Sequence, residues 1–457
     1  MLFPAHIFKA YDIRGLVEGE LSEQLAYYIG RAFIRVLRER NISLEQKAIV
    51  VGYDMRPSSS MFTKEIIRAI TDEGIDVVNI GMTTTPVFNF ACAHFDDYAG
   101  GIMITASHNP AEYNGFKLTM DDGLPIGKET GMERIRELVE LQQFSVAATE
   151  KGIVIERDVR KDYIEQIFSL VDTSIIKPLK IVIDAGNGMG SAIFPLWLQE
   201  LPVEVEYLYL EPDGRFPNHE ANPLKVETLQ DLQKAVIAHG ADFGFALDGD
   251  ADRVGLVDEK GQVVDASYVS ALIGQEFLRD YPHAHMLYDL RSSQVLAEVF
   301  EEAGASTQMC MVGHANIKKM MRETDAQYAS ELSLHIFFES MYYLESTDLC
   351  LLYLLHLLSR EHQPMSTLVK PLQRYAHSGE INFEVAKKDA AISRIRKAYE
   401  SSAEEVSELD GIWMKFDWGW MNVRKSNTEP VLRLNLETRS KKETEERVAE
   451  LRALIEH

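Results

Sequence analysis

Residues 47–54 read KAIVVGYD, an apolar run that ends in an aspartate. Two later stretches repeat this theme, LKIVIDA at 179–185 and HMLYDL at 285–290. In each, an aspartate (Asp54, Asp184 or Asp289) stands at or near the end of the run, before a turn and an expected helix. Short apolar runs that alternate with amphipathic stretches are typical of βαβ units around parallel sheets. The wide spacing of the three stretches predicts three related α/β domains.

The end of the chain has a different pattern. Strands are expected at EINFEVA (380–386), GIWMKFD (411–417), GWMNVRK (419–425) and VLRLNLE (431–437), with helices over 388–401 and up to His457. The short connections favour hairpins, so we expect an antiparallel α+β domain here. The predicted domains are 1–150, 151–256, 257–370 and 371–457.

Composition and charge exclude several classes of protein. The chain has 457 residues, of which 46% are apolar and 26% charged, as in a folded globular protein. Its net charge of -24 argues against nucleic acids or anionic membranes as partners. Three scattered cysteines suggest neither a disulfide framework nor a zinc site. No signal-type segment opens the chain, and the apolar run 349–358 is too short to span a membrane, so a cytoplasmic protein with a buried helix there is expected.

The first segment that carries candidate catalytic residues is GGIMITASHNPAEYNGFK (100–117), in which an apolar strand runs into a loop that contains Ser107. Ligands bind at the carboxyl ends of strands in α/β sheets, so Ser107 stands where a nucleophile or phosphate carrier would. An ordinary strand-end turn is the alternative. A serine hydrolase is disfavoured because GxSxG is absent and His108, adjacent in sequence, is not expected to face Ser107.

The second segment is FGFALDGDADRVGLVD (243–258), where Asp248, Asp250 and Asp252 alternate after an apolar strand. Carboxylates this close repel one another unless a cation neutralises them, and hard oxygen ligands favour Mg²⁺ or Ca²⁺. An EF-hand does not fit, because Arg253 stands where that loop requires glycine and a strand precedes the loop. A magnesium site is therefore predicted, with a solvated acidic turn as the alternative.

Two further segments carry polar groups suited to a sugar phosphate. In VRKSNTEPVLRL (423–434), guanidinium, hydroxyl and amide donors surround a turn and suit a phosphate. In ASELSLHIFF (329–338), Glu331, Ser333 and His335 alternate and would share one face if the segment is a strand. Carboxylate, hydroxyl and imidazole groups can bind sugar hydroxyls and transfer protons. An exposed hairpin turn and a structural histidine are the respective alternatives.

A glycine-rich turn, DAGNGMG at 184–190, follows a strand like a dinucleotide-binding turn. Its spacing is GxGxG, and Ser191 stands where the fingerprint requires a third glycine. A dinucleotide enzyme is therefore the weakest alternative.

Taken together, TASHNP, DGDADR, SELSLH and RKSNTEP, in this order, resemble the α-D-phosphohexomutase family, in particular its bacterial phosphomannomutase/phosphoglucomutase branch. The resemblance covers essentially the whole chain, and IFKAYDIRG (7–15) and PDGRFPNHEANPLKVE (212–227) look most like the phosphomannomutase members. It implies three related α/β domains plus a C-terminal α+β domain around a central cleft.

The resemblance also implies a reaction. A phosphoserine would give its phosphoryl group to mannose 6-phosphate or mannose 1-phosphate, and also to glucose phosphates, through a bound hexose 1,6-bisphosphate. The expected cofactors are Mg²⁺ and this bisphosphate as activator, and the expected state is a monomer or weak homodimer. Phosphoglucosamine mutase and a non-catalytic sugar-phosphate-binding homologue are the alternatives.

The resemblance assigns roles to residues of this sequence. The metal ligands would be Ser107, Asp248, Asp250 and Asp252. The residues that act on the transferring phosphoryl group or the reacting hydroxyl would be Ser107, Lys117, Arg253, His335, His314, Arg14 and Tyr11. The substrate would be bound by Glu331, Ser333, Arg424, Ser426, Asn427, Thr428 and Arg433.

The sugar-binding segment departs from the family pattern, in which glycines usually flank the Glu-hydrophobic-Ser core. Here Ser330 and Leu334 replace them. Glycine would allow close backbone approach or an unusual backbone conformation, which Leu334 would not easily permit. Sugar specificity and rate are the properties that this change would affect.

Overall fold

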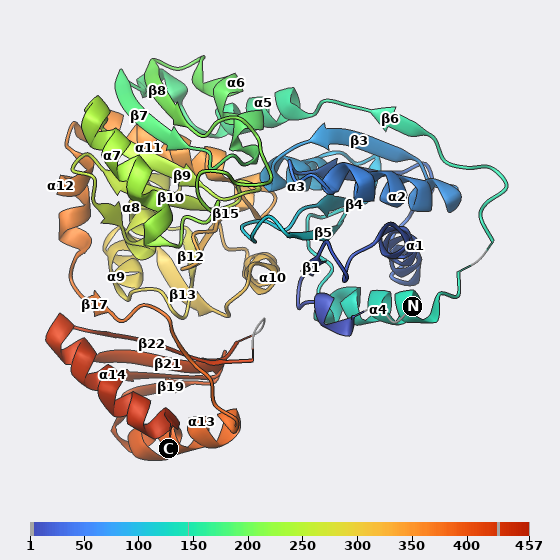
Figure 1. Ribbon diagram of the computed structural model, residues 1–457. Helices are drawn as coiled ribbons and strands as arrows, with labels where there is room; N and C mark the ends of the chain where they lie inside the picture. The colour runs from blue at the N-terminus through green and yellow to red at the C-terminus, as the bar shows by residue number, and fades with distance from the viewer. Residues whose placement is uncertain (1–3, 145, 427–429, 457) are drawn as a thin grey trace. The chain divides into compact units, whose positions relative to one another are not determined.

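A computed structural model describes residues 4–456, apart from residue 145 and residues 427–429 (Figure 1). The chain forms two compact units. One comprises Met1–Val264 and Ser333–Ser366, and the other comprises Asp265–Leu332 and Thr367–His457.

The stretch 47–54 lies at the centre of a six-stranded sheet in the first unit. In spatial order its strands are β1 (Ile13–Leu16), β5 (Tyr113–Met120), β4 (Tyr98–Ile104), β2 (Ala48–Tyr53), β3 (Val77–Met82) and β6 (Val154–Glu156). β4, β2, β3 and β6 are parallel, as expected, but β5 runs antiparallel to β4 and β1. The connection from β4 to β5 is too short for a crossover helix, so the chain turns back and places the Ser107 loop at this end of the sheet.

Four helices lie beside this sheet, and three of them follow the expected amphipathic pattern, whereas Thr85–His94 is buried over most of its length. The four helices are α1 (Glu23–Glu39), α2 (Ser59–Asp72), α3 (Thr85–His94) and α4 (Glu133–Leu141). The side chain of Ser22 caps α1 by accepting a hydrogen bond from the Leu25 amide at 3.1 Å. Leu25, Ile29 and Phe33 of α1 are buried in the core against the sheet.

The second sheet of this unit contains the stretch 179–185. Its strands are β11 (Val263–Val264), β10 (Val254–Asp258), β9 (Phe243–Leu247), β7 (Leu179–Asp184) and β8 (Val203–Leu208). β8, β7 and β9 are parallel, and β10 and β11 continue the sheet as antiparallel strands. The predicted domain boundary after residue 256 is wrong, because it falls inside β10 and the hairpin continues the sheet to Val264.

Three more helices, α5 (Arg160–Leu170), α6 (Phe194–Leu198) and α7 (Gln230–His239), precede β9. The first unit also includes the hairpin of β15 (Ile336–Phe338) and β16 (Leu344–Glu345), followed by α11 (Thr347–Glu361). The apolar run 349–358 is buried within α11, as predicted. Helix α12 (Met365–Val369) follows.

In the second unit, the stretch 285–290 forms the central strand of a parallel group. β12 (His285–Asp289) lies between β13 (Ser306–Cys310) and β14 (Tyr328–Ser330). The helices of this region are α8 (Ala266–Asp280), α9 (Val295–Glu302) and α10 (His314–Thr324).

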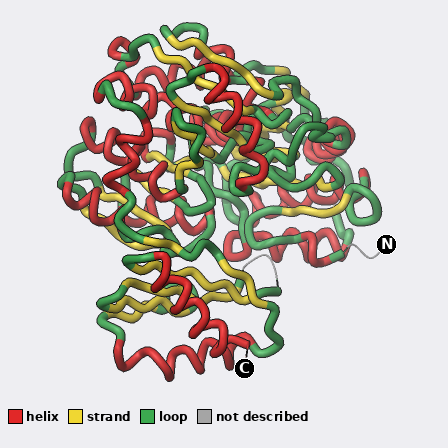
Figure 2. Tube along the Cα trace, turned by 60° about the vertical axis from the view of Figure 1, so that its left-hand side comes forward, coloured by secondary structure: helices red, strands yellow, loops and turns green. Residues whose placement is uncertain are grey.

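The C-terminal part of the second unit is an antiparallel sheet, as predicted. Its strands are β17 (Ala376–His377), β18 (Ile381–Phe383), β19 (Glu405–Ser407), β20 (Ile412–Phe416), β21 (Gly419–Lys425) and β22 (Leu432–Thr438). The order is β17-β22-β21-β20-β19, and β18 also pairs with β22. Helices α13 (Lys388–Tyr399) and α14 (Lys441–Glu456) cover one face of this sheet (Figure 2).

The three repeated aspartates make the same local contact at the end of their strands. Asp54, Asp184 and Asp289 each accept a hydrogen bond from the backbone amide two residues later, at 3.0, 2.9 and 2.7 Å. A carboxylate that binds this amide stabilises the turn that leaves the strand. The shared turn, three α/β regions and an α+β tail confirm the predicted fold class, whereas the central cleft and the other domain boundaries stay predictions.

Candidate active site

Ser107 lies three residues after β4 in a strained turn. Its φ is 50°, in the left-handed region that residues other than glycine seldom adopt. The amide of Ser107 donates to Thr105 Oγ1 at 2.9 Å, and the side chain is buried. Strained backbone of this kind persists only where the surroundings enforce it, and it clusters at functional sites.

The hydroxyl of Ser107 lies between a carboxylate and an imidazole. Its Oγ donates to Asp248 Oδ2 at 3.0 Å and lies 3.2 Å from Nδ1 of His108. The expectation that His108 would not face Ser107 is therefore wrong, and we attribute the contact to the left-handed turn at Ser107, which departs from extended backbone. Burial lowers the pKa of His108 well below its usual value, and Arg253 adds to this effect.

Arg56 holds the loop that carries Ser107, a role that the sequence analysis missed. Its guanidinium is buried and donates to the backbone carbonyls of Ser107 and Asn109 at 2.9 and 2.6 Å. It also donates to the carbonyls of Pro110 and Tyr113 at 2.7 and 2.9 Å. Its remaining donor, Nε, faces Asp54 at 3.2 Å. The available signal was the Asp-x-Arg pattern at 54–56, which returns at 289–291.

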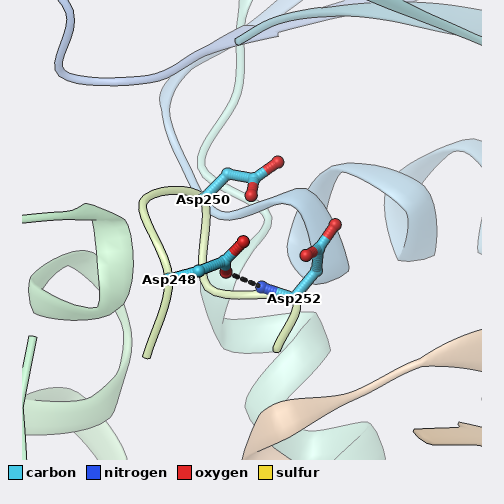
Figure 3. A group of neighbouring side chains, drawn as sticks. All are labelled: Asp248, Asp250 and Asp252. Atoms are coloured by element: carbon cyan, nitrogen blue, oxygen red, sulfur yellow. Dashed lines mark hydrogen bonds between the residues drawn. The ribbon is translucent and has the colours of Figure 1, made fainter. Parts of the chain in front are cut away.

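Asp248, Asp250 and Asp252 occupy the loop between β9 and β10, and all three are buried. Their carboxylates offer ligand atoms that all lie within 4.8 Å of one another (Figure 3). Asp248 Oδ1 accepts a hydrogen bond from the Asp252 amide at 3.0 Å, which fixes the turn. The predicted cluster therefore forms, directly beside Ser107.

Glycine allows the two loops to approach each other. A Cβ on Gly249 would lie 2.5 Å from the carbonyl oxygen of Ser107, so this position cannot carry a side chain without movement of the serine loop. On the other side, a Cβ on Gly188 would lie 2.8 Å from the carbonyl oxygen of Gly249. Met189 also donates its amide to that oxygen at 2.9 Å. The glycines of 184–190 thus have a packing role against the Asp248–Asp252 loop.

The electrostatics of the cluster suit a cation. Burial raises the pKa of Asp248 well above its usual value, and Asp252 and Asp250 add to this effect. Burial acts in the same direction on Asp252, but Lys117 and His335 outweigh it and hold that pKa well below its usual value. Asp250 Oδ1 is buried and has no hydrogen-bond partner among the described residues. Closely spaced carboxylates with an unsatisfied oxygen fit a hard divalent metal ion.

Lys117 and Arg253 surround the carboxylates with positive charge. Lys117 Nζ donates to Asp250 Oδ2 at 2.6 Å and to Asp252 Oδ2 at 2.7 Å. Burial works to lower the pKa of Lys117, but these two carboxylates outweigh it and raise the pKa, so the side chain is an ammonium. Arg253 Nε lies 3.7 Å from Asp248 Oδ2.

Arg14 contacts the serine loop from β1. Its guanidinium donates to Asn109 Oδ1 at 2.7 Å and to the carbonyl of Ala106 at 3.2 Å. Asp12 fixes the group from the other side at 2.8 Å. Tyr11 is half-buried in the bend just before β1.

The segment 331–335 is a turn between β14 and β15, so the predicted alternation along a strand is wrong. Leu334 has a φ of 72°, and its carbonyl oxygen accepts a hydrogen bond from the Val254 amide at 3.2 Å. The left-handed conformation that glycine would favour is therefore kept, at a cost of about 1–2 kcal/mol for a residue with a Cβ. Ser330 ends β14 in extended backbone.

His335 comes next to the carboxylate cluster within the first unit. Its Nε2 lies 3.2 Å from Asp252 Oδ1, and its Nδ1 lies 3.2 Å from Oγ of Ser333. The first unit thus brings together residues from separate segments of the sequence: Ser107, the three aspartates, Lys117, Arg253, Arg14, Ser333 and His335.

Glu331 belongs to the second unit, where Arg291 and Gly313 hold it. Glu331 Oε1 accepts a hydrogen bond from the Gly313 amide at 3.0 Å and lies 3.4 Å from Arg291 Nη2. Arg291 also pairs with Asp289 at 2.6 Å. His314 follows Gly313 as the first residue of α10. Arg291 was not predicted, although its Asp-x-Arg pattern matches that of Arg56.

Arg424 and Arg433 are direct partners across β21 and β22. Both contact the carboxylate of Glu380, Arg424 Nη2 at 3.0 Å and Arg433 Nη1 at 3.2 Å. Ser426 is half-buried where β21 ends, and its amide donates to the carbonyl of Val431 at 3.0 Å. Asn427 and Thr428 lie outside the described residues.

Comparison with known proteins places the chain in a family. Four family models of phosphoglucomutase/phosphomannomutase match: α/β/α domain I at residues 5–146, domain II at 161–261, domain III at 265–375 and the C-terminal domain at 380–454. The chain is 38% identical over 440 residues to a phosphomannomutase of Escherichia coli, with 94% of each chain covered. It is also 38% identical to the phosphohexose mutases of Xanthomonas campestris, with 96% of each covered.

A solved structure from Burkholderia thailandensis, described as a phosphoglucomutase/phosphomannomutase family protein, matches with a TM-score of 0.90 and 32% identity. The match covers 99% of this chain and 98% of that one. Four domains of these types and a serine beside a carboxylate cluster define the phosphohexomutase class of enzymes. The chain belongs to the phosphoglucomutase/phosphomannomutase family, which confirms the resemblance drawn from the sequence.

In the described part of the chain, every helix falls short of the length and apolar character that a membrane span requires.

Proposed function

We propose that this protein is a phosphomannomutase that also accepts glucose phosphates. The observation that carries the proposal is the buried Ser107 hydroxyl, held 3.0 Å from Asp248 within a cluster of three carboxylates. Relatives named phosphomannomutase, 38% identical in E. coli and 36% identical in Methanocaldococcus jannaschii, support mannose phosphates as substrates.

The proposed reaction begins with phosphorylated Ser107. The free hydroxyl of a hexose monophosphate attacks the phosphorus, the bond from phosphorus to Ser107 Oγ breaks, and a new oxygen–phosphorus bond forms on the sugar. The hydroxyl proton passes to a base of the enzyme. The resulting hexose 1,6-bisphosphate turns round while bound. Ser107 Oγ then attacks the other phosphorus, the bond from that phosphorus to the sugar oxygen breaks, and the base returns its proton to the freed sugar oxygen.

The first unit supplies the groups for phosphoryl transfer. Asp248, Asp250 and Asp252, together with the phosphoryl group on Ser107, would hold Mg²⁺, which neutralises charge on the transferring group when bound. As an ammonium, Lys117 suits a cation that steadies the bridging oxygen. His335 suits the base, because its imidazole lies beside Asp252.

Other residues would orient the substrate. Arg253 would hold phosphoryl oxygens, while Arg14, Tyr11 and His314 would act near the reacting hydroxyl. Glu331 and Ser333 would bind sugar hydroxyls. The phosphate that is not transferred would be bound by Arg424, Ser426, Asn427, Thr428 and Arg433, as guanidinium groups bind phosphate in a forked geometry.

The test is a substrate panel with purified protein, Mg²⁺ and a hexose 1,6-bisphosphate primer. Mannose 1-phosphate and glucose 1-phosphate should be converted to their 6-phosphates, and Ser107→Ala should convert neither. Conversion of glucosamine phosphates alone would point to phosphoglucosamine mutase. Binding of sugar phosphates without conversion of any would support a non-catalytic homologue. The observation that favours this alternative is the strained backbone at Leu334.

A further inference from the structure

The pair Arg424 and Arg433 needs an anion even in the free protein. The two residues are opposite each other on adjacent antiparallel strands, a placement in which like charges destabilise a sheet. The side chain of Arg424 is 1% exposed, so water screens this repulsion poorly. A negative charge at this position therefore stabilises the pair.

Glu380 supplies that charge from the residue just before β18. Its Oε2 contacts Arg424 Nη2 at 3.0 Å and Arg291 Nη1 at 3.3 Å, and its Oε1 contacts Arg433 Nη1 at 3.2 Å. Burial works to raise the pKa of Glu380, but the three arginines outweigh it and lower the pKa, so the group is an anion at neutral pH.

Arg291 has further carboxylate partners in Asp289 and Glu331, and Asp410 Oδ2 lies 3.9 Å from Arg424 Nη1. Glu380 is the closer partner of Arg424 and is shared with Arg433. Arg424 Nε is buried without a hydrogen-bond partner in the part of the chain that the structure describes. A phosphate monoester carries a charge of about -1.5 to -2 and three terminal oxygens, against one charge and two oxygens for a carboxylate. A sugar phosphate therefore suits this cluster better than Glu380 does.

We propose that the Glu380 carboxylate is an internal substitute for the substrate phosphate. It occupies the cluster of Arg291, Arg424 and Arg433 in the free protein, and a substrate phosphate displaces it on binding. This inference rests on the proposed function, in which Arg424 and Arg433 bind the phosphate that is not transferred, and it adds Arg291 to that site. In that reaction the bisphosphate must leave the arginines once in every turnover. A carboxylate ready to replace it weakens the phosphate complex and aids its release.

The test compares Glu380→Gln with wild-type protein by isothermal titration, using mannose 6-phosphate and, separately, inorganic phosphate. Removing the competing charge should lower the Kd by about three- to tenfold. In the mutase assay, KM and kcat should fall together, because release of the phosphate becomes slower. The control is Glu384→Gln, which removes an exposed carboxylate just after β18 and should leave Kd unchanged.

A Kd that is unchanged or higher in Glu380→Gln would overturn the inference, since the carboxylate would then only organise the arginines. If this variant folds poorly, Glu380→Asp is the alternative. Its shorter side chain keeps the negative charge but moves it away from the arginines, so Kd should fall by a smaller factor. Arg424→Met separates the two proposals. If it does not weaken binding, the proposed phosphate site is wrong, whereas weaker binding in Arg424→Met without tighter binding in Glu380→Gln contradicts only the role of Glu380.

Discussion

Arg56 directs all five donors of its guanidinium group at acceptors near Ser107, four of them backbone carbonyls of the serine loop. The ring of Phe216 lies 5.1 Å from the guanidinium carbon and covers it. An ammonium group cannot reproduce this planar fork. Arg56 is therefore a positioning residue, whose effect reaches the substrate through Ser107.

We predict that Arg56→Lys lowers kcat by at least about tenfold, because small displacements of a reacting group are costly. KM for mannose 6-phosphate should change little, since the Arg56 side chain is buried and its donors are used within the protein. Steady-state kinetics on the mutase reaction measures both values. Arg40→Lys, on the exposed end of α1, is the control and should behave as wild type. An unchanged kcat, or a KM that rises by as large a factor as kcat falls, would contradict this role.

Substitutions at Leu334 test the backbone strain in the turn at residues 331–335. At a φ of 72°, a Cβ is unfavourable, so Leu334→Gly should be more stable than Leu334→Ala by about 1 kcal/mol, although both lose the buried side chain. The comparison is made by urea unfolding. The control position is Lys234, which is exposed in α7. There Lys234→Ala should be more stable than Lys234→Gly, because alanine is favoured over glycine in a helix by about 1 kcal/mol. Alanine as the more stable variant at 334 would contradict the left-handed turn.

At the scale of elements, one buried carboxylate links three helices of the first unit. Asp348 of α11 accepts hydrogen bonds from Tyr163 of α5 and Trp197 of α6, both at 2.8 Å. Burial raises the pKa of Asp348 from its usual 3.8 to about 6, even though these two donors oppose the change.

This raised pKa gives the stability of the protein a pH dependence. The folded state binds the proton of Asp348 more tightly than the unfolded state, so the stabilisation is complete below about pH 4 and is lost as the pH rises to about 6. The difference corresponds to about 3 kcal/mol. Asp348→Asn should remove this dependence, which urea unfolding between pH 4 and pH 7 would measure. If the free energy of unfolding changed with pH equally in wild type and variant over this range, the role given to Asp348 would be contradicted.

The elements also show what the sequence could and could not predict. Apolar runs ending in Asp54, Asp184 and Asp289 predicted the strands, because buried parallel strands have a simple hydrophobic pattern. The turn at 331–335 could not be predicted, since alternation over a few residues does not distinguish a strand from a turn. Its conformation depends on contacts with Asp289 and Val254, which are remote in sequence.

At the scale of the whole molecule, most of the candidate site could be predicted because its residues lie in short contiguous motifs. Arg56, Arg291 and Glu380 could not, because their roles depend on which loops the fold brings to them. Arg56 binds a loop about fifty residues away in sequence, and Glu380 meets arginines from three strand ends. The overall charge of -24 likewise gave no sign of the local cluster of arginines.

The central claim is that Ser107 carries a phosphoryl group, and intact-protein mass spectrometry tests it most directly. After incubation with a hexose 1,6-bisphosphate and Mg²⁺, wild-type protein should gain the mass of one phosphate, and Ser107→Ala should gain none. Absence of the added mass from wild-type protein, or an equal gain in Ser107→Ala, would contradict the account.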